Sequence, residues 1–259
     1  MALNVTIKKK LAYFDLEVEF TCPDERTLVL IGPSGGGKTT LIRIIAGLER
    51  PDEGRIICQG ETWFDSEGDI CMPPQKRRLA YVFQEYALFP HLTLLENSAF
   101  AADDKREAED LLERFGIGHL RNRKPHMVSG GERQRCALCQ AMARRPRVLL
   151  LDEPFSALDV LTRRNLREEV NRIGGQFSCP ILYVTHDIGE ALFLADNLLS
   201  IVQGKIDRRW LQRSITRACP WDSPQKQQAG LVWASHIRQN TAGLQAEVSE
   251  DLCLKRRTI

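Results

Sequence analysis

Residues 32–39 have the types and spacing of a loop that binds phosphate groups. They fit the pattern G-x-x-x-x-G-K-S/T and read Gly32, Pro33, Ser34, Gly35, Gly36, Gly37, Lys38 and Thr39. Glycines let successive backbone N–H groups turn toward one anion, and the helix expected to follow adds its positive N-terminal end. Lys38 supplies a charge for the β- and γ-phosphates of a nucleotide, and Thr39 offers a hydroxyl to Mg²⁺. The alternative, a structural glycine turn, is disfavoured by the apolar run just before the loop.

Two adjacent carboxylates, Asp152 and Glu153, end a second apolar run at residues 148–151. The first is expected at the carboxyl end of a buried strand, beside the phosphate loop, where it can hold Mg²⁺ through water. The second can polarise an attacking water as a general base. Paired acids are common at strand ends, so this interpretation depends on the phosphate loop.

A second glycine-containing segment, Ser129-Gly130-Gly131, precedes a helix predicted at residues 132–144. It has the character of another anion-binding helix N-terminus. One nucleotide does not need two such sites on one chain, which favours a role in covering the nucleotide held by another copy. A capping box, with Ser129 as N-cap and Glu132 at N3, is an alternative that is compatible with this role.

The elements that must position these motifs follow from the apolar pattern. Short strands alternate with helices, which predicts an α/β fold with a mainly parallel, helix-covered sheet. Strands are predicted at 16–20, 28–31, 55–59, 79–83, 148–151, 181–185 and 198–202, and helices at 41–48, 104–115, 132–144, 160–173 and up to 195. The pattern weakens from residue 207 onward, and no regular structure is predicted there.

The composition narrows the class of protein. Among 259 residues, 36 Lys and Arg stand against 34 Asp and Glu, a balance that argues against nucleic acid as the main partner. No apolar run approaches the ~18 residues that cross a bilayer, and the N-terminus lacks a secretory pattern, so a cytosolic location is expected. The eight cysteines are interpreted as reduced thiols. Cys136 and Cys139 fall in a helical pattern as small buried residues, with a metal or redox role as the alternative.

Over about residues 3–206 the chain resembles the ATP-binding-cassette (ABC) ATPases. Besides the phosphate loop and the acidic pair, residues 129–134 match the signature of that family, Gln84 its Q-loop, residues 156–159 its D-loop and His186 its switch histidine. The resemblance implies a P-loop NTPase with a mainly parallel core sheet, an antiparallel β subdomain and a helical signature subdomain. It places the cassette at 1–206, the helical subdomain at about 88–145, and a tail without a full regulatory β-domain at 207–259.

The resemblance further implies ATP and Mg²⁺, held in a head-to-tail dimer in which each nucleotide lies between one phosphate loop and the other chain's signature. The residues implied in catalysis are Glu153, His186, Gln84 and Lys38. Those implied for Mg²⁺ are Thr39, Gln84 and Asp152. Nucleotide contacts are implied for residues 32–39, Thr40, Ser129, Gly130, Gly131 and Asp159. Tyr13 is preferred for stacking on adenine, whereas Phe14 begins a strand pattern and is expected in the core.

Residues 61–97 are similar to the oxyanion importers, especially those for molybdate or tungstate and then those for sulfate. This implies the ATP-hydrolysing subunit of an importer, at the cytoplasmic face of the membrane, acting with permease subunits and indirectly with a periplasmic solute-binding protein. Tyr86, Leu88, Phe89 and Pro90 offer an apolar patch for a short permease helix, or else pack against the helical insertion. The alternatives are another importer, an unfused exporter subunit and a non-transport ABC ATPase.

Overall fold

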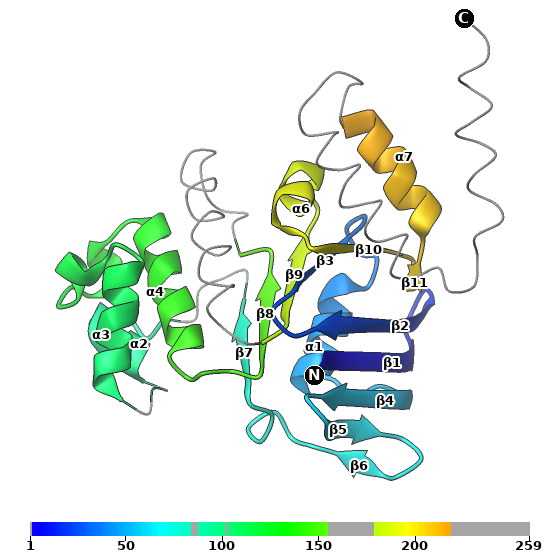
Figure 1. Cartoon of the computed structure of the whole chain (residues 1–259), viewed down its shortest axis with the longest axis horizontal. Helices are drawn as coiled ribbons and strands as arrows, with labels where there is room; N and C mark the ends of the chain where they lie inside the picture. Colours follow the sequence, from blue (N-terminus) through cyan, green and yellow to red (C-terminus); the bar gives the residue numbers. More distant parts are fainter. Residues whose placement is uncertain (1, 84–87, 101, 103, 155–178, 219–259) are drawn as a thin grey trace, which may run out of the picture.

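The fold is built on one long sheet (Figure 1). The computed structural model describes residues 2–83, 88–100, 102, 104–154 and 179–218, so the helix predicted at 160–173 lies outside the described residues. Within them the strand order is β6-β5-β4-β1-β2-β11-β10-β3-β9-β8-β7. The strands are β1 Ala2–Lys10, β2 Asp15–Pro23, β3 Thr27–Ile31, β4 Glu53–Cys58, β5 Glu61–Asp65, β6 Ile70–Cys71, β7 Leu79–Val82, β8 Val148–Asp152, β9 Ile181–Thr185, β10 Asn197–Val202 and β11 Lys205–Ile206.

The sheet has a parallel half and an antiparallel half. Strands β10, β3, β9, β8 and β7 are parallel neighbours, and β3, β8 and β9 are buried along their whole length. Such strands have helices on both faces, which explains their continuous apolar runs. Strands β2, β1, β4, β5 and β6 pair antiparallel. The predicted α/β class, with a mainly parallel core and an antiparallel subdomain, is therefore confirmed.

The helices are distributed between the sheet and a separate group beside β7 (Figure 1). That group holds α2 Leu94–Ala99, α3 Lys105–Arg114 and α4 Gly130–Met142, with 3₁₀ turns at Gly118–Leu120 and Pro125–Met127. The remaining helices are α1 Lys38–Ala46, α6 Ile188–Leu194 and α7 Arg208–Ala218. Cys136 and Cys139 are fully buried in α4, as predicted. None of the described helices combines the length and the apolar character that crossing a bilayer requires.

Strands β1, β5, β6 and β11 and helix α7 were not predicted. Asp207 caps α7 by accepting a bond from the Trp210 N–H at 2.9 Å, and Leu211 is buried while Trp210 packs on the same core. The expectation that regular structure ends at residue 207 is therefore wrong for residues 208–218, where exposed arginines obscure the apolar face.

A buried arginine fastens the C-terminal end of α1 to the antiparallel half. Arg77 is 1% exposed, and its guanidinium donates to the carbonyl oxygens of Ile44 at 2.9 Å and Ile45 at 2.7 Å. It also donates to Met72 at 2.9 Å and to Trp63 at 3.3 Å. The last carbonyls of a helix have no partner within that helix. Arg77 supplies one, and so fixes the helix that carries the phosphate loop.

Candidate functional site

The glycine-rich loop of residues 32–39 joins β3 to α1, as predicted. It lies against strand β10: a Cβ atom on Gly36 would be 2.8 Å from the carbonyl oxygen of Ile201. The N–H of Gly204, just beyond β10, donates to the carbonyl oxygen of Gly36 at 3.0 Å. The loop therefore has room for backbone only on this side. Gly37 has a φ of 101°, in the left-handed region, and starts the helix from there.

Lys38 lies folded into the loop. Its Nζ donates to the carbonyl oxygens of Gly32 at 2.8 Å and Pro33 at 2.9 Å, and the residue is 6% exposed. Burial lowers the pKa of this ammonium, while the charges of Glu153 and Asp152 raise it. The charge is thus held inside the cradle where an anion would sit. Thr40, the next contact expected from the resemblance, is half-buried in the first turn of α1.

Asp152 ends β8 directly beside α1. The Thr39 hydroxyl donates to its Oδ1 at 3.4 Å, and the Tyr81 hydroxyl donates to its Oδ2 at 3.1 Å. Burial raises the pKa of this carboxyl, and the two hydrogen bonds lower it. A hydroxyl and a buried carboxylate side by side are oxygen donors of the kind that Mg²⁺ prefers. The pair therefore fits that cation.

Glu153 and His186 face each other across the carboxyl ends of β8 and β9. The Nδ1 of His186 lies 3.1 Å from Oε1 of Glu153, and the side chains are 59% and 22% exposed respectively. Glu153 has a φ of 47°, which is uncommon for a residue with a Cβ, and its N–H donates to the Val184 carbonyl at 3.0 Å. The structure thus brings together the two acids, the lysine, the threonine and the histidine predicted from sequence.

A buried carboxylate behind His186 escaped the sequence analysis. Glu190 is 5% exposed and accepts bonds from the Tyr183 hydroxyl at 2.8 Å and from the Thr185 hydroxyl. Its N–H donates to Asp187 Oδ1 at 2.8 Å, the cap of α6. These bonds fix both neighbours of His186. The sequence does carry one signal for it: Asp187 and Glu190 are three residues apart, the spacing of an N-cap residue and the acidic residue at N3 of a helix.

Ser129 begins α4 and forms the predicted capping box. Its hydroxyl accepts from the Glu132 N–H at 3.4 Å, and Glu132 Oε2 accepts from the Ser129 N–H at 2.7 Å. Ser129 is exposed, so the positive end of a 13-residue helix faces outward. Gly130 and Gly131 form its first turn, with no Cβ atoms to cover the N–H groups.

Of the remaining predicted residues, Tyr13 is 96% exposed in the turn between β1 and β2. Phe14 is half-buried, and its ring lies 3.5 Å from the position of a Cβ on Gly37. The phenylalanine therefore packs beside the phosphate loop, but it precedes β2 and is not one of the buried core residues, contrary to expectation. The tyrosine lies next to it in the same turn. Gln84, Tyr86 of the predicted apolar patch, and the predicted D-loop at residues 156–159, including Asp159, lie outside the described residues.

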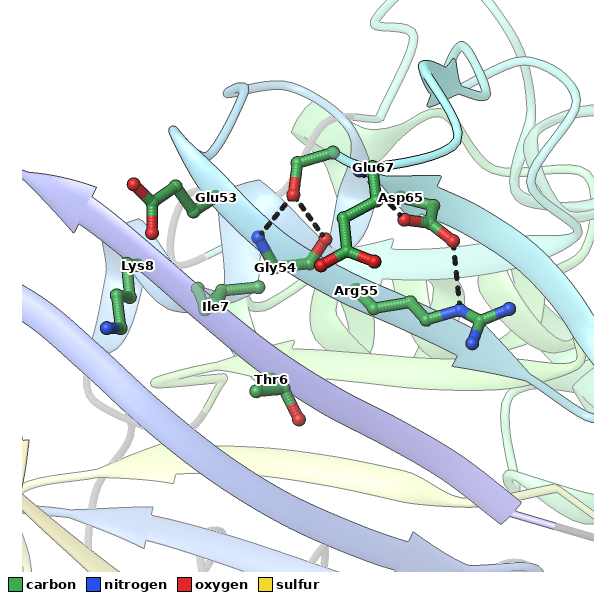
Figure 2. A pocket seen from close by; sticks show the side chains of 9 residues that line it. Thr6, Ile7, Lys8, Glu53, Gly54, Arg55, Asp65 and Glu67 are labelled. Carbon is green, nitrogen blue, oxygen red and sulfur yellow. Dashed lines mark hydrogen bonds and ion pairs between the residues drawn. The ribbon is translucent and has the colours of Figure 1, made fainter.

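A second hollow, of about 530 Å³, lies on the antiparallel half of the sheet (Figure 2). Its lining includes Lys8, Glu53 and Glu67 and none of the predicted site residues. Its polar groups bond among themselves: Ser66 bonds the backbone of Gly54, and Arg55 pairs with Asp65 at 3.1 Å. These contacts hold the turn after β5 against β4.

Comparison with known proteins decides the family. The family model described as "ABC transporter" matches residues 16–156. The chain belongs to the ABC transporter family. The match begins in β2 and includes the phosphate loop, the helices beside β7, and both Asp152 at the end of β8 and Glu153 just after it.

Curated relatives of this ABC protein carry names of molybdenum import proteins. The molybdate/tungstate import ATP-binding protein WtpC of Archaeoglobus fulgidus is 41% identical over 80% of this chain and 85% of its own. Two ModC molybdenum import ATP-binding proteins are 38% identical (Photobacterium profundum, 90% of this chain) and 46% identical (Methylococcus capsulatus, 74%). The chain spans only 66% and 55% of those two ModC proteins.

Solved structures agree on the fold. The dimeric structure of a bacterial ABC transporter cassette superposes with a TM-score of 0.66 at 26% identity, over 80% of this chain and 97% of that one. An ATP-binding cassette in its ADP conformation gives a TM-score of 0.69 at 22% identity, over 80% and 90% of the two chains. The predicted cassette architecture is therefore confirmed.

Proposed function

We propose that this chain is the ATP-hydrolysing subunit of an ABC importer that powers uptake of an oxyanion such as molybdate or tungstate. The observation that carries the ATPase assignment is the meeting of Lys38, Thr39, Asp152, Glu153 and His186 at the carboxyl ends of β3, β8 and β9. Ligands bind at this edge of open α/β sheets. The names of the relatives supply the class of solute.

The phosphate loop and Lys38 bind the β- and γ-phosphates of ATP. Thr39 and Asp152 hold Mg²⁺, together with Gln84. When bound, this ion neutralises charge on the phosphates. Glu153 orients and deprotonates the attacking water, and His186, 3.1 Å from its carboxylate, keeps that carboxylate directed at the reacting phosphate. Tyr13 provides an exposed ring for adenine.

A second copy of the chain completes each site. The exposed N-terminus of α4, with Ser129, Gly130 and Gly131, closes on the γ-phosphate held by the partner's loop, and Asp159 joins it. Backbone N–H groups at a helix start carry partial positive charge suited to this role.

A permease docks in a groove between β7 and the separate group of helices, and the cassette is thereby held at the cytoplasmic face of the membrane. The groove has a volume of about 310 Å³ and is lined by Phe83, Phe89 and Phe100 among others. Phe83 is 41% exposed and Phe100 63%. The rings of Phe89 and Phe100 lie 4.5 Å apart, whereas Leu88 packs on the core. Exposed aromatic rings in a concave site suit a short apolar helix.

The test uses the purified chain, its permease and its solute-binding protein in liposomes. We expect MgATP hydrolysis to rise when the binding protein carries molybdate or tungstate and to remain basal with sulfate. Stimulation by sulfate alone would instead assign a sulfate importer. Hydrolysis that ignores every solute, or solute movement outward, would contradict the importer assignment.

A further inference from the structure

Helix α4 contacts the catalytic strand end directly through one buried side chain. Gln134 lies one turn inside the helix and is fully buried, and its Nε2 donates to the carbonyl oxygen of Pro154. Pro154 is the residue that follows Glu153. The contact therefore joins the helix that begins at Ser129 to the backbone of the proposed general base.

The backbone at Glu153 is held from both sides. On one side its N–H donates to the Val184 carbonyl at 3.0 Å, which attaches it to β9. On the other side, the side-chain amide of Gln134 donates to the carbonyl oxygen of Pro154, the residue after Glu153. Between these anchors Glu153 keeps a φ of 47°. An uncommon backbone conformation persists only where the surroundings determine it, and such positions cluster at functional sites.

The chemical environment also makes Gln134 unusual. On the same side of α4, one turn further on, Ala137 and Leu138 are buried and apolar. A buried amide is costly unless it is hydrogen-bonded, so an apolar side chain would serve better if packing were its purpose. The amide is explained by the carbonyl that it holds.

We propose that Gln134 is a positioning residue that fixes Glu153 through Pro154. This inference rests on the proposed function and on the head-to-tail dimer. In that dimer the N-terminus of α4 touches the nucleotide on the partner's phosphate loop, while Gln134 of the same helix sets the base that acts at this chain's own loop. One rigid helix thus connects the two nucleotide sites, so that closing one site aligns the base of the other.

The first test replaces Gln134 by methionine, which keeps the volume and removes the amide donor. We expect ATP affinity to change by less than about twofold and kcat to fall between about 10- and 100-fold, the scale for a misplaced catalytic group. The MgATP dimer should still form, and it should persist longer than in wild type because its ATP is hydrolysed more slowly. The control is Gln212→Met on the exposed face of α7, which should behave as wild type. An unchanged kcat overturns the proposal. Loss of dimerisation together with kcat also overturns it, because that result means that Gln134 supports the N-terminus of α4 at Ser129 and not Glu153.

A second variant, Gln134→Glu, tests the donor itself. Its carboxylate cannot donate to Pro154, but a buried carboxyl has a raised pKa and regains an O–H donor as the pH falls. The ratio of its kcat to that of wild type should rise as pH is lowered from 8 toward 6. A flat ratio contradicts the proposal. Failure of the ATPase assignment is distinguishable, because the wild type itself would then turn over no ATP.

Discussion

The imidazole of His186 lies with its Nδ1 3.1 Å from Oε1 of Glu153, so the two residues that follow β8 and β9 form one unit. The unit is supported from behind by Glu190, which binds the hydroxyls of Tyr183 and Thr185. Lys38 makes its hydrogen bonds elsewhere, to the loop carbonyls of Gly32 and Pro33, although its pKa, which burial lowers, is raised by the charges of Glu153 and Asp152. Mutations in the Glu153–His186 pair and at Lys38 should therefore have different effects on the protein.

Glu153→Gln should keep ATP binding and slow hydrolysis by ~10²-fold or more, the usual scale for losing a general base. Because ATP then persists, the variant should accumulate a dimer that wild type forms only transiently. Gel filtration with MgATP measures this, and elution as monomer alone would count against both the base and the dimer.

Lys38→Ala should abolish ATP turnover without unfolding the chain, because the lost charge stabilises the transferred phosphoryl group. Steady-state hydrolysis and circular dichroism provide the measurements. Lys205→Ala, an exposed lysine on β11, is the matched control. Turnover by Lys38→Ala within a factor of two of wild type would refute the assignment of the loop.

Ser129→Arg separates capping from contact with a partner. If Ser129 only caps α4, the change should cost about 1 kcal/mol of stability and spare turnover. We expect instead that ATP still binds while dimerisation and hydrolysis fail, since arginine is too large for a closed interface. Mixing this variant with Lys38→Ala should restore part of the activity through one composite site. Normal turnover by Ser129→Arg alone would leave only the capping role.

The capping box also predicts a pH dependence. The backbone N–H of Ser129, bonded to Glu132, lowers the pKa of that carboxyl from its usual 4.5. A lowered folded-state pKa stabilises the protein above the unfolded pKa, and this contribution is lost as pH falls through the folded value. Wild type should therefore exceed Glu132→Gln in unfolding free energy at pH 6, and the difference should shrink below pH 4.5. A constant difference in urea melts over this range would contradict the assignment.

Arg77→Met should destabilise the fold by about 3 kcal/mol or more, because several carbonyl groups lose a charged donor. Urea unfolding measures the loss. The neighbouring exposed Arg78→Met is its control and should stay within about 0.5 kcal/mol of wild type. Equal stability of the two variants would show that water replaces the guanidinium.

The parallel core could be predicted because its strands carry their own signal. Strands β3, β8 and β9 are continuous apolar runs; β8 ends in Asp152, and β3 and β9 are followed directly by Gly32 and His186. Strand β1 was not predicted although Leu3, Val5 and Ile7 alternate with polar residues, because the three lysines that follow Ile7 are typical of a solvated segment and give the strand no apolar end.

The supporting residues of the site could not be predicted from the sequence. Arg77 stands in a basic run that is typical of a solvated surface, and it is buried because it bridges the end of α1 and strand β5. Gln134 meets Pro154 from 20 positions away in the sequence. Motif spacing identifies groups that contact a ligand, whereas the groups that hold them depend on tertiary contacts.

The position of β3 in the sheet also has a consequence for biosynthesis. The strand leaves the ribosome early, yet both of its neighbours, β9 at Ile181–Thr185 and β10 at Asn197–Val202, come near the end of the described chain. At ordinary translation speeds of about 5–20 residues per second, the phosphate loop waits on the order of ten seconds for the strands that form its walls. A nascent chain therefore has the loop sequence long before it has the strands that flank it, and nucleotide binding begins only after β9 and β10 have been synthesised.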